Sequence, residues 1–288
     1  MIGGLLTPEE LRALARARLS LRRRGAAAPG AHLSWRRGAS LEFADHRPYQ
    51  PGDDFRLIDW NVYARLRRLV TKTFAHEVEA PLYVLLDASG SMAVGGKERF
   101  ARRLAAALLF VAYRGGDRFA VHPFRERIEA AGSPRRGRAA LAAGFGALTA
   151  LAPAGETDLS GALSAWATSG PEPGLCVVVS DFLCPRGYRD GLRALRHGRH
   201  ALAAVQVLSR DDLDPPRLGE VRLRDGETGR GRTLAVGPGA LRAYRGALRA
   251  WNRALAETCQ ELRVPYFLFR SDASPVEAAL TLVGGWKG

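Results

Sequence analysis

The feature that most constrains this chain is an apolar run, LYVLL at residues 82–86, that stops abruptly at Asp87. The residues that follow place Ser89 and Ser91 at alternate positions after that carboxylate. A short apolar run that ends in turn-forming residues is typical of a buried strand. We therefore expect a buried strand that delivers Asp87, Ser89 and Ser91 into the loop at its carboxyl end.

These three side chains offer the oxygen ligands that a hard divalent cation such as Mg²⁺ prefers. Mg²⁺ usually keeps several waters in a tight octahedron, so one carboxylate and two hydroxyls supply part of its shell. The same short polar residues also suit a turn that caps the next helix. The pattern Asp-x-Ser-x-Ser by itself therefore leaves two readings open, a metal site and a capped strand-to-helix turn.

Two later positions favour the metal site. Thr157 lies in GETDLSGAL, a Gly-led loop just before a helical segment, and Asp181 directly follows the strand-like run LCVVVS. In an open parallel sheet, loops at the carboxyl ends of neighbouring strands converge on one crevice. We expect Thr157 and Asp181 to join Asp87, Ser89 and Ser91 around a single cation.

DASGSM, with the later Thr157 and Asp181, resembles the metal-ion-dependent adhesion site of von Willebrand factor A domains, and all five positions of that pattern are intact. The resemblance implies that Ser89, Ser91 and Thr157 coordinate Mg²⁺ most directly. It also implies that Asp87 and Asp181 act directly or through bound waters, and that a partner's carboxylate completes the shell. Mn²⁺ and Ca²⁺ stay open, because geometry decides the selectivity.

The upstream residues 29–77 contain RPYQPGDDFRLIDWNVYARLRRLVTKTFAHE, which resembles the bacterial family called domain of unknown function 58. The two resemblances together cover most of the chain. Members of that family pair this upstream region with an A-type domain, and they are similar to proteins thought to work beside AAA+ ATPases of the MoxR type. The resemblance therefore implies a MoxR-type ATPase as a partner.

From residue 82 onward, apolar strand runs alternate with amphipathic helices, which predicts an α/β fold with a mainly parallel sheet flanked by helices. The resemblance makes this fold von Willebrand factor A-like, that is, Rossmann-like. A pair of short strands near 218–237 predicts an inserted hairpin. Expected strands are 82–86, 118–124, 175–180, 201–208, 220–224, 231–236 and 264–269, and expected helices are 97–114, 135–150, 159–168, 187–197, 240–262 and 274–283.

Residues 1–80 are expected to form a separate domain from 81–288, with an N-terminal helix and a small β-rich subdomain. Thr7-Pro8-Glu9-Glu10 supplies an N-cap, a proline at the first helical position and a Glu at the third, which predicts a helix from about Pro8 to Arg24. Turn signals at Gly38 and at Pro51-Gly52-Asp53 predict hairpins within 31–80.

An acidic and basic cluster in this region has two readings. Asp and Arg side chains near a Pro-Gly turn can dock a partner, or they can form structural ion pairs and turn caps. The structural reading is favoured because turn residues need no ligand. The residues concerned are Asp53, Asp54, Arg56, Asp59 and Arg65.

The formal net charge is +14, from 43 basic and 29 acidic residues, and nearly every basic residue is Arg. Such a field attracts acidic partners or nucleic acid. A composition rich in Arg, Ala, Gly and Pro also reflects a GC-rich genome, which spreads charge without making a site. The basic runs 22–24, 65–68 and 135–138 are separate and carry no interleaved aromatic platform, so nucleic-acid binding is an alternative that the sequence does not favour.

The remaining composition narrows the class of protein. Cys176, Cys184 and Cys259 are odd in number and lack a Cys-x-x-Cys spacing, which argues against a disulfide framework and a zinc site; Cys176 is predicted to be strand core. The longest apolar run, at 104–113, is shorter than the roughly 20 residues that cross a bilayer. No signal peptide or membrane anchor is visible. Some members of the family carry membrane-spanning helices ahead of the motif, and because none is visible in this sequence we expect a cytoplasmic form.

The charges of the predicted site indicate its role. Two carboxylates and three neutral hydroxyls leave a dication under-neutralised, so it should bind an external anion. Hydrolysis would instead need a placed base, and no His or Glu adjoins the motif except Glu156. We expect a binding or adaptor protein, not an enzyme. It would capture an acidic residue of a partner protein and assist a MoxR-type AAA+ ATPase in complex assembly or maturation. A metal-assisted phosphohydrolase is the remaining alternative.

Overall fold

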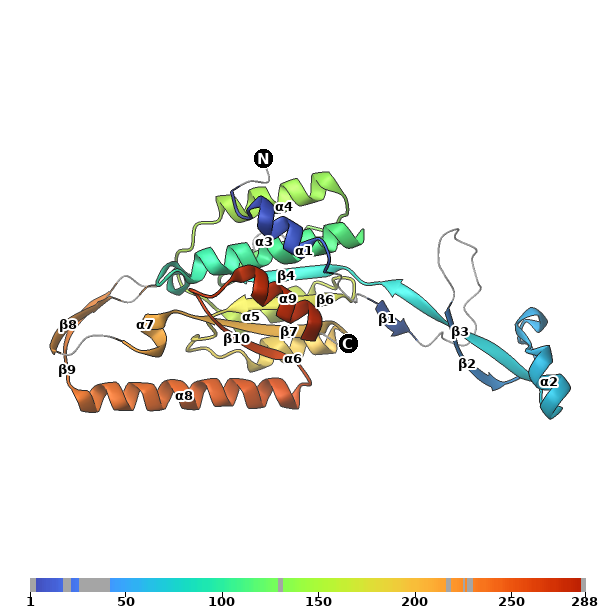
Figure 1. Ribbon diagram of the computed structural model, residues 1–288. Helices are drawn as coiled ribbons and strands as arrows, with labels where there is room; N and C mark the ends of the chain where they lie inside the picture. The colour runs from blue at the N-terminus through green and yellow to red at the C-terminus, as the bar shows by residue number, and fades with distance from the viewer. Residues whose placement is uncertain are drawn as a thin grey trace. The chain divides into compact units, whose positions relative to one another are not determined.

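The computed structural model describes residues 4–17, 22–25, 42–128, 132–215, 219–224, 226 and 230–285. The chain divides into two compact units. The smaller unit is Arg22–Glu79, and the larger unit is formed by Met1–Leu21 with Ala80–Gly288. Each is built around its own sheet, as Figure 1 shows.

The larger unit contains a five-stranded parallel sheet. Its strands are β4 (Leu82–Asp87), β5 (Phe119–Phe124), β6 (Leu175–Ser180), β7 (Ala201–Leu208) and β10 (Tyr266–Arg270). They lie in the order β10-β7-β6-β4-β5, and every neighbouring pair runs parallel. Every residue of β4 and β6 is buried, as expected of strands covered on both faces. The predicted α/β fold with a parallel sheet flanked by helices is confirmed.

Helices cover both faces of this sheet (Figure 1). One face carries α1 (Pro8–Leu14), α3 (Lys97–Gly115), α4 (Arg138–Ala150) and α9 (Pro275–Gly285). The other carries α5 (Leu159–Thr168), α6 (Arg189–His197) and α8 (Pro238–Glu261). Because side chains alternate along a strand, Val84 and Leu86 of β4 join the first layer, whereas Tyr83 and Leu85 join the second.

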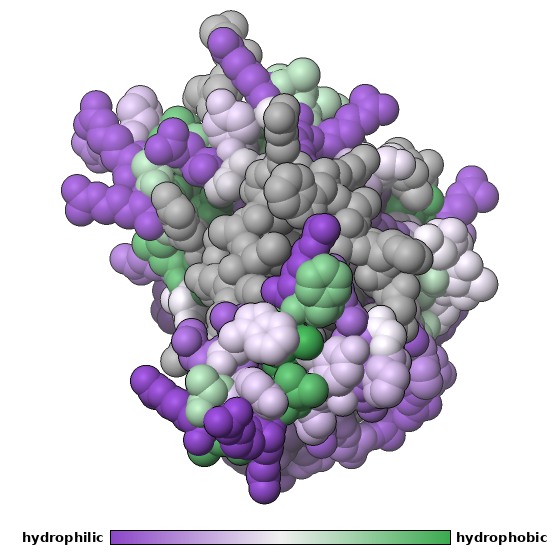
Figure 2. All heavy atoms as spheres, turned by 90° about the vertical axis from the view of Figure 1, so that its right-hand side faces the viewer, coloured by the Kyte–Doolittle hydropathy of each residue, from purple (hydrophilic) through white to green (hydrophobic). Residues whose placement is uncertain are grey.

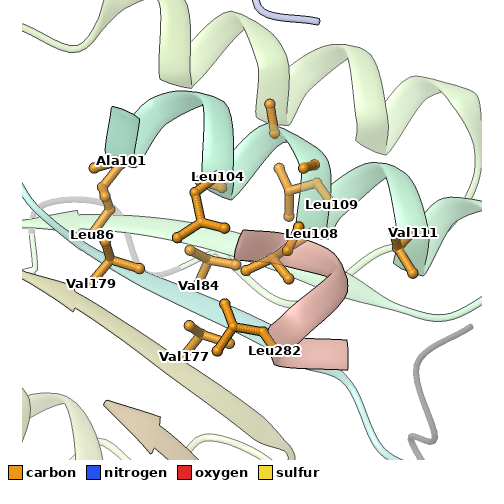
Figure 3. Close-up of a cluster of buried hydrophobic side chains, with 14 of the residues drawn as sticks. Val84, Leu86, Ala101, Leu104, Leu108, Leu109, Val111, Val177, Val179 and Leu282 are labelled. Carbon is orange, nitrogen blue, oxygen red and sulfur yellow. The ribbon is translucent and has the colours of Figure 1, made fainter. Parts of the chain in front are cut away.

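The longest helix on the first face of the sheet is α3, and its apolar side packs against the sheet. Leu104 and Leu108 pack with Val84 of β4, Val177 of β6 and Leu282 of α9 (Figure 3). All five side chains are fully buried. This packing fixes the position of α3, and therefore of Lys97 at its first turn, relative to the ends of the strands.

Two further elements follow β7. The short helix α7 (Arg210–Leu213) comes directly after it, and an antiparallel hairpin of β8 (Gly219–Arg224) and β9 (Gly231–Val236) lies between α7 and α8. The hairpin occupies the segment near 218–237 where an insertion was expected. Cys176, predicted to be strand core, lies fully buried in β6.

The N-terminal helix is shorter than predicted. Thr7 and Glu10 form the expected reciprocal capping box, but α1 ends at Leu14. The prediction that the helix continues to about Arg24 is wrong, because Arg22–Gly25 forms strand β1 and pairs antiparallel with a neighbouring strand. Hydrogen bonds between strands outweigh the weak helix preference of a short segment.

Contacts also group α1 with the larger sheet and not with the β-rich residues, where the sequence had placed it. Leu14 is fully buried in the core layer of α3. The Glu10 carboxylate forms an ion pair with the Arg103 guanidinium of α3. The helix therefore docks through both an apolar and a charged contact.

The smaller unit is a three-stranded antiparallel sheet. Its strands β1 (Arg22–Gly25) and β2 (Glu42–Pro48) flank β3 (Val70–Glu79). Between β2 and β3 the chain forms a 3-10 turn, η1 (Phe55–Leu57), and a helix, α2 (Trp60–Leu66), where only hairpins were predicted. Helix forms there because the Asp54 and Asp59 carboxylates cap η1 and α2. The turn signal at Gly38 lies outside the described residues.

The acidic residues of this unit hold its own structure. Asp53 accepts hydrogen bonds from the Arg47 guanidinium and from a backbone N–H. Asp59 contacts the His46 ring at 2.9 Å and the Lys72 ammonium at 3.4 Å. The hydrogen bond from His46 is the largest of the effects that lower the pKa of Asp59 to about 2.

The basic members of the predicted cluster lie instead on an exposed surface. Arg56 and Arg65 are exposed beside Phe55 and Leu66, each 66% exposed, and Trp60, 58% exposed. Figure 2 shows green, hydrophobic spheres among pale and purple ones. The acids of the cluster are thus structural, while its arginines are available for contact.

The core of the larger unit predicts a specific loss of stability. Leu104→Ala should lower the free energy of unfolding by about 2–5 kcal/mol, because it leaves a cavity between α3 and the sheet. Leu280→Ala, at a position of α9 that is 37% exposed, is the matched control and should cost less than about 1 kcal/mol. Urea unfolding followed by far-ultraviolet circular dichroism measures both, and equal losses would contradict the packing described.

Candidate functional site

The strand order brings the predicted site residues to one edge of the sheet. β4 lies between β5 and β6, so the chain leaves β4 toward one neighbour and later returns to the other. Open α/β sheets bind ligands at such a reversal, outside the carboxyl ends of the strands. Asp87 ends β4, and Asp181 directly follows β6.

Asp87 links the ends of these two strands. Its carboxylate accepts a hydrogen bond from the Ser89 N–H at 2.9 Å and another from the Ser180 hydroxyl at 2.5 Å. The Ser180 oxygen in turn accepts from the Phe182 N–H at 2.9 Å. Burial, followed by the negative charge of Asp181, raises the pKa of Asp87 to about 6, although both hydrogen bonds oppose the shift.

The two serine hydroxyls point toward one another. Their oxygens lie 3.0 Å apart, with Ser89 fully buried and Ser91 partly exposed. The motif continues into a 3-10 turn, η2 (Gly90–Ala93), for which Ser89 is the N-cap residue but makes no side-chain capping bond. This observation disfavours the reading in which the motif is only a capped turn.

Backbone bonds hold the Thr157 loop against the serine loop. The Gly90 N–H donates to the Gly155 carbonyl at 2.9 Å, and the Ala154 N–H donates to the Ala88 carbonyl at 3.0 Å. Thr157 itself is 5% exposed. The structure therefore brings the loop of Thr157 to the same edge as Ser89 and Ser91.

Arg125, directly after β5, fastens these loops together. Its guanidinium donates to the Ala88 carbonyl at 3.1 Å and to the Ala152 carbonyl at 2.9 Å. Its own carbonyl oxygen lies 3.4 Å from the Thr157 hydroxyl oxygen and accepts from the Asp158 N–H. The long contact to Thr157 leaves that hydroxyl oxygen with lone pairs for another partner.

Asp181 already contacts a cation. Its carboxylate accepts from the Lys97 ammonium at 2.8 Å and from the Leu183 N–H at 3.1 Å. Lys97 is only 2% exposed, and its ammonium also lies 3.2 Å from the Asp212 carboxylate of α7. Burial lowers the pKa of Lys97, but the charges of Asp181 and then Asp212 outweigh it, so the pKa is raised above its usual value.

Sequence reasoning predicted five site residues and missed three polar side chains that lie beside them, Lys97, Ser180 and Asp212. A signal for Lys97 was present, because it is one of three lysines in a chain of 43 basic residues. It also begins α3, where a positive charge opposes the helix dipole and needs compensation. No local pattern points to Asp212, which reaches the site through the folding of the sheet.

The inserted hairpin also reaches the motif loop. A Cβ atom on Gly226 would lie 3.0 Å from the Gly90 carbonyl oxygen and 3.3 Å from the Ser91 Cα. Only glycine permits so close a backbone approach without displacement. The hairpin therefore forms part of the wall beside Ser91.

The donor set is suited to a hard cation. Among the residues that the structure describes, no three His, Cys, Asp or Glu side chains form a metal-binding group, so a cation here would depend on hydroxyl oxygens. The hydrogen bonds already made by Asp87 and Asp181 suit contact through metal-bound water, as Mg²⁺ often makes. Lys97 is the feature that opposes a dication, because its charge lies 2.8 Å from an Asp181 oxygen.

Residues 45–254 match the family described as "Protein of unknown function DUF58". The chain belongs to this family. The DUF58 chain is 30% identical over 250 residues to the uncharacterized protein Rv1480 of Mycobacterium tuberculosis and to the uncharacterized protein Mb1516 of Mycobacterium bovis, covering 84% of its own length and 78% of theirs. The predicted resemblance to this family is confirmed, but uncharacterized relatives assign no activity.

Two solved structures are similar to the DUF58 chain at low identity. BatB from Bacteroides thetaiotaomicron is 13% identical with a TM-score of 0.47, over 72% of this chain and 98% of its own. An aerotolerance-related membrane protein from Bacteroides fragilis is 13% identical with a TM-score of 0.46, over 72% and 97%. In the DUF58 chain, none of the helices described is long and apolar enough to cross a membrane.

The raised pKa of Asp87 predicts that removing this carboxylate stabilises the protein at neutral pH but not at acidic pH. Since the pKa rises from 3.8 to about 6 on folding, ionised Asp87 destabilises the fold above pH 6, and the effect vanishes below the unfolded value. In EDTA, Asp87→Asn should raise the free energy of unfolding at about pH 7 by on the order of 1–3 kcal/mol, and not at about pH 4.

Urea unfolding at both pH values measures this gain. Asp190→Asn, at a side chain that is 82% exposed on α6, is the control and should change the free energy of unfolding little. A variant at Asp87 that is destabilised equally at both pH values would contradict the raised pKa.

Proposed function

We propose that this chain is a divalent-metal-dependent protein-interaction module that binds an acidic residue of a partner protein. The metal ion would be held by Asp87, Ser89, Ser91, Thr157 and Asp181. The observation that carries the proposal is the convergence of three loops, after β4, before α5 and after β6, at one edge of the parallel sheet. In this proposal the larger unit is a von Willebrand factor A-like domain with a metal-ion-dependent adhesion site.

The residues divide by the contacts that they already make. Ser89, Ser91 and Thr157 would provide direct ligands, because their oxygens keep lone pairs for a cation. Asp87 and Asp181, held by backbone N–H groups, would accept hydrogen bonds from metal-bound waters. Mg²⁺ is the favoured ion, Mn²⁺ and Ca²⁺ being further candidates, and when bound it would offer a coordination position to the partner's carboxylate.

The surroundings of the site favour binding over hydrolysis. Glu156, which adjoins Thr157, lies 3.9 Å from the Arg186 guanidinium and is about half exposed. His122 and His200 are buried and pack against Tyr83 and Trp166 in the core layer formed with α5, α6 and α8. Proton transfer to a water at the proposed ion needs a base within hydrogen-bond reach.

The wider part of the proposal concerns the partner. DUF58 proteins resemble proteins thought to work beside MoxR-type AAA+ ATPases, and this chain would assist such an ATPase in assembling or maturing a complex. The resemblance is the support for this step. An acidic side chain on the ATPase or on its client would be the residue captured.

Metal binding is the first test. Calorimetric titration of Mg²⁺ and of Mn²⁺ into the metal-stripped protein should show one site, and Ser89→Ala and Thr157→Val should each weaken binding about tenfold or more, as loss of a ligand or its support does. Thr168→Val is the matched control, because that hydroxyl donates within α5 to the Ser164 carbonyl and should not affect metal binding.

Capture of an acidic residue is the second test. Fluorescence anisotropy of a labelled peptide with a single Glu should rise with protein in Mg²⁺ but not in EDTA, and the matched peptide with Gln should not bind. Metal binding that is unchanged in both site variants, or equal binding of the two peptides, would overturn the proposal.

A further inference from the structure

Lys97 occupies a position that a lysine rarely takes. Its side chain is 3% exposed at the first residue of a 19-residue helix, where both burial and the helix dipole disfavour a positive charge. Two carboxylates compensate, Asp181 at 2.8 Å and Asp212 at 3.2 Å. Asp181 lies in the loop after β6 and Asp212 lies in α7 after β7, so the ammonium bridges two segments at the edge of the sheet.

One of these carboxylates belongs to the proposed metal site. A dication that approaches Asp181 meets the positive charge of Lys97 on the same carboxylate, in surroundings that screen charge poorly. We infer that Lys97 is the resident counter-ion of the site, which neutralises Asp181 before metal binds and must release that carboxylate to the metal-bound waters. This inference rests on the proposed function, because it concerns the same site.

The second carboxylate gives the displaced ammonium a place to remain. Asp212 and Ser209 form a reciprocal capping box at α7, and the Tyr244 hydroxyl of α8 donates to the Asp212 carbonyl at 2.8 Å. Asp212 is therefore fixed in place, and Lys97 can keep that ion pair while it leaves Asp181. The exchange needs a rotation of the lysine stem only, since the packed core holds α3 in place.

The inference predicts opposite effects of two variants. Lys97→Met removes the competing charge and should tighten Mg²⁺ binding about tenfold or more, whereas Asp212→Asn leaves Lys97 to Asp181 alone and should weaken it. Calorimetry on the full chain measures both affinities. Circular dichroism is the check that each variant is folded.

A double variant separates the specific contact from net charge. Lys97→Met with Asp212→Asn removes one positive and one negative charge together, so the local formal charge is unchanged while Asp181 loses its ion pair. This variant should still bind Mg²⁺ more tightly than the wild type. It also leaves only one carboxylate of the pair, Asp181, without the Lys97 ammonium, and so protects the test against misfolding.

Lysine-specific NMR reports the contact directly. The chain has three lysines, Lys72, Lys97 and Lys287, so selective ¹³C and ¹⁵N labelling of lysine gives three side-chain signals, and Lys97→Met assigns one of them. The Lys97 signal should shift as Mg²⁺ is added, with the affinity found by calorimetry. The Lys72 signal should stay constant, because that ammonium pairs with Asp59 in the smaller unit.

The outcomes distinguish the two proposals. If the wild type binds Mg²⁺, and both Lys97→Met and the double variant bind it within about twofold of the wild type with a constant Lys97 signal, the counter-ion role is overturned and the metal site stands. If the wild type and every variant fail to bind Mg²⁺, the proposed function itself is overturned. Tighter binding in both Lys97 variants establishes the counter-ion.

Discussion

The burial of β4 on both faces is the constraint on which the larger unit depends. A strand covered by helices on each side cannot hold a polar side chain without a partner. The first charged side chain of β4 therefore lies at its carboxyl end. That side chain is Asp87, whose carboxylate accepts hydrogen bonds from the Ser89 N–H and from the Ser180 hydroxyl of the adjacent strand. Because β4 and β6 run parallel, Asp181, which follows β6, lies at the same edge of the sheet as Asp87. We call these two carboxylates the charged rim of the sheet.

The rim holds two buried carboxylates that the fold compensates differently. Burial, followed by the charge of Asp181, raises the pKa of Asp87, and its hydrogen bonds do not offset that rise, whereas Asp181 receives the Lys97 ammonium. An apolar core could not supply that cation; it comes from the first turn of α3, which the core fixes in place. The same packing that stabilises the sheet therefore sets the electrostatics of the candidate site, and it links the site to Asp212 beyond β7.

In the smaller unit, the acidic and the basic residues of one charged segment have different roles. Asp59 caps the N-terminus of α2 and pairs with His46 and Lys72, and Asp53 pairs with Arg47, so both acids support the structure of the unit. Its arginines at 56 and 65 lie instead beside exposed aromatic and aliphatic side chains on η1 and α2. Composition alone treats both charges as one cluster, and only the direction of each side chain separates them.

The sequence by itself determined the parallel α/β architecture, because apolar periodicity is a local signal, and its motifs indicated the family. It also placed Asp87 and Asp181 at the ends of neighbouring strands, while their role as metal ligands stays a prediction. It could not determine where α1 ends, since strand pairing of Arg22–Gly25 decides that. It also could not place Lys97 between Asp181 and Asp212, which are far apart along the chain. Tertiary structure alone decided that contact, because the order of strands in the sheet, and not spacing in sequence, sets which loops meet.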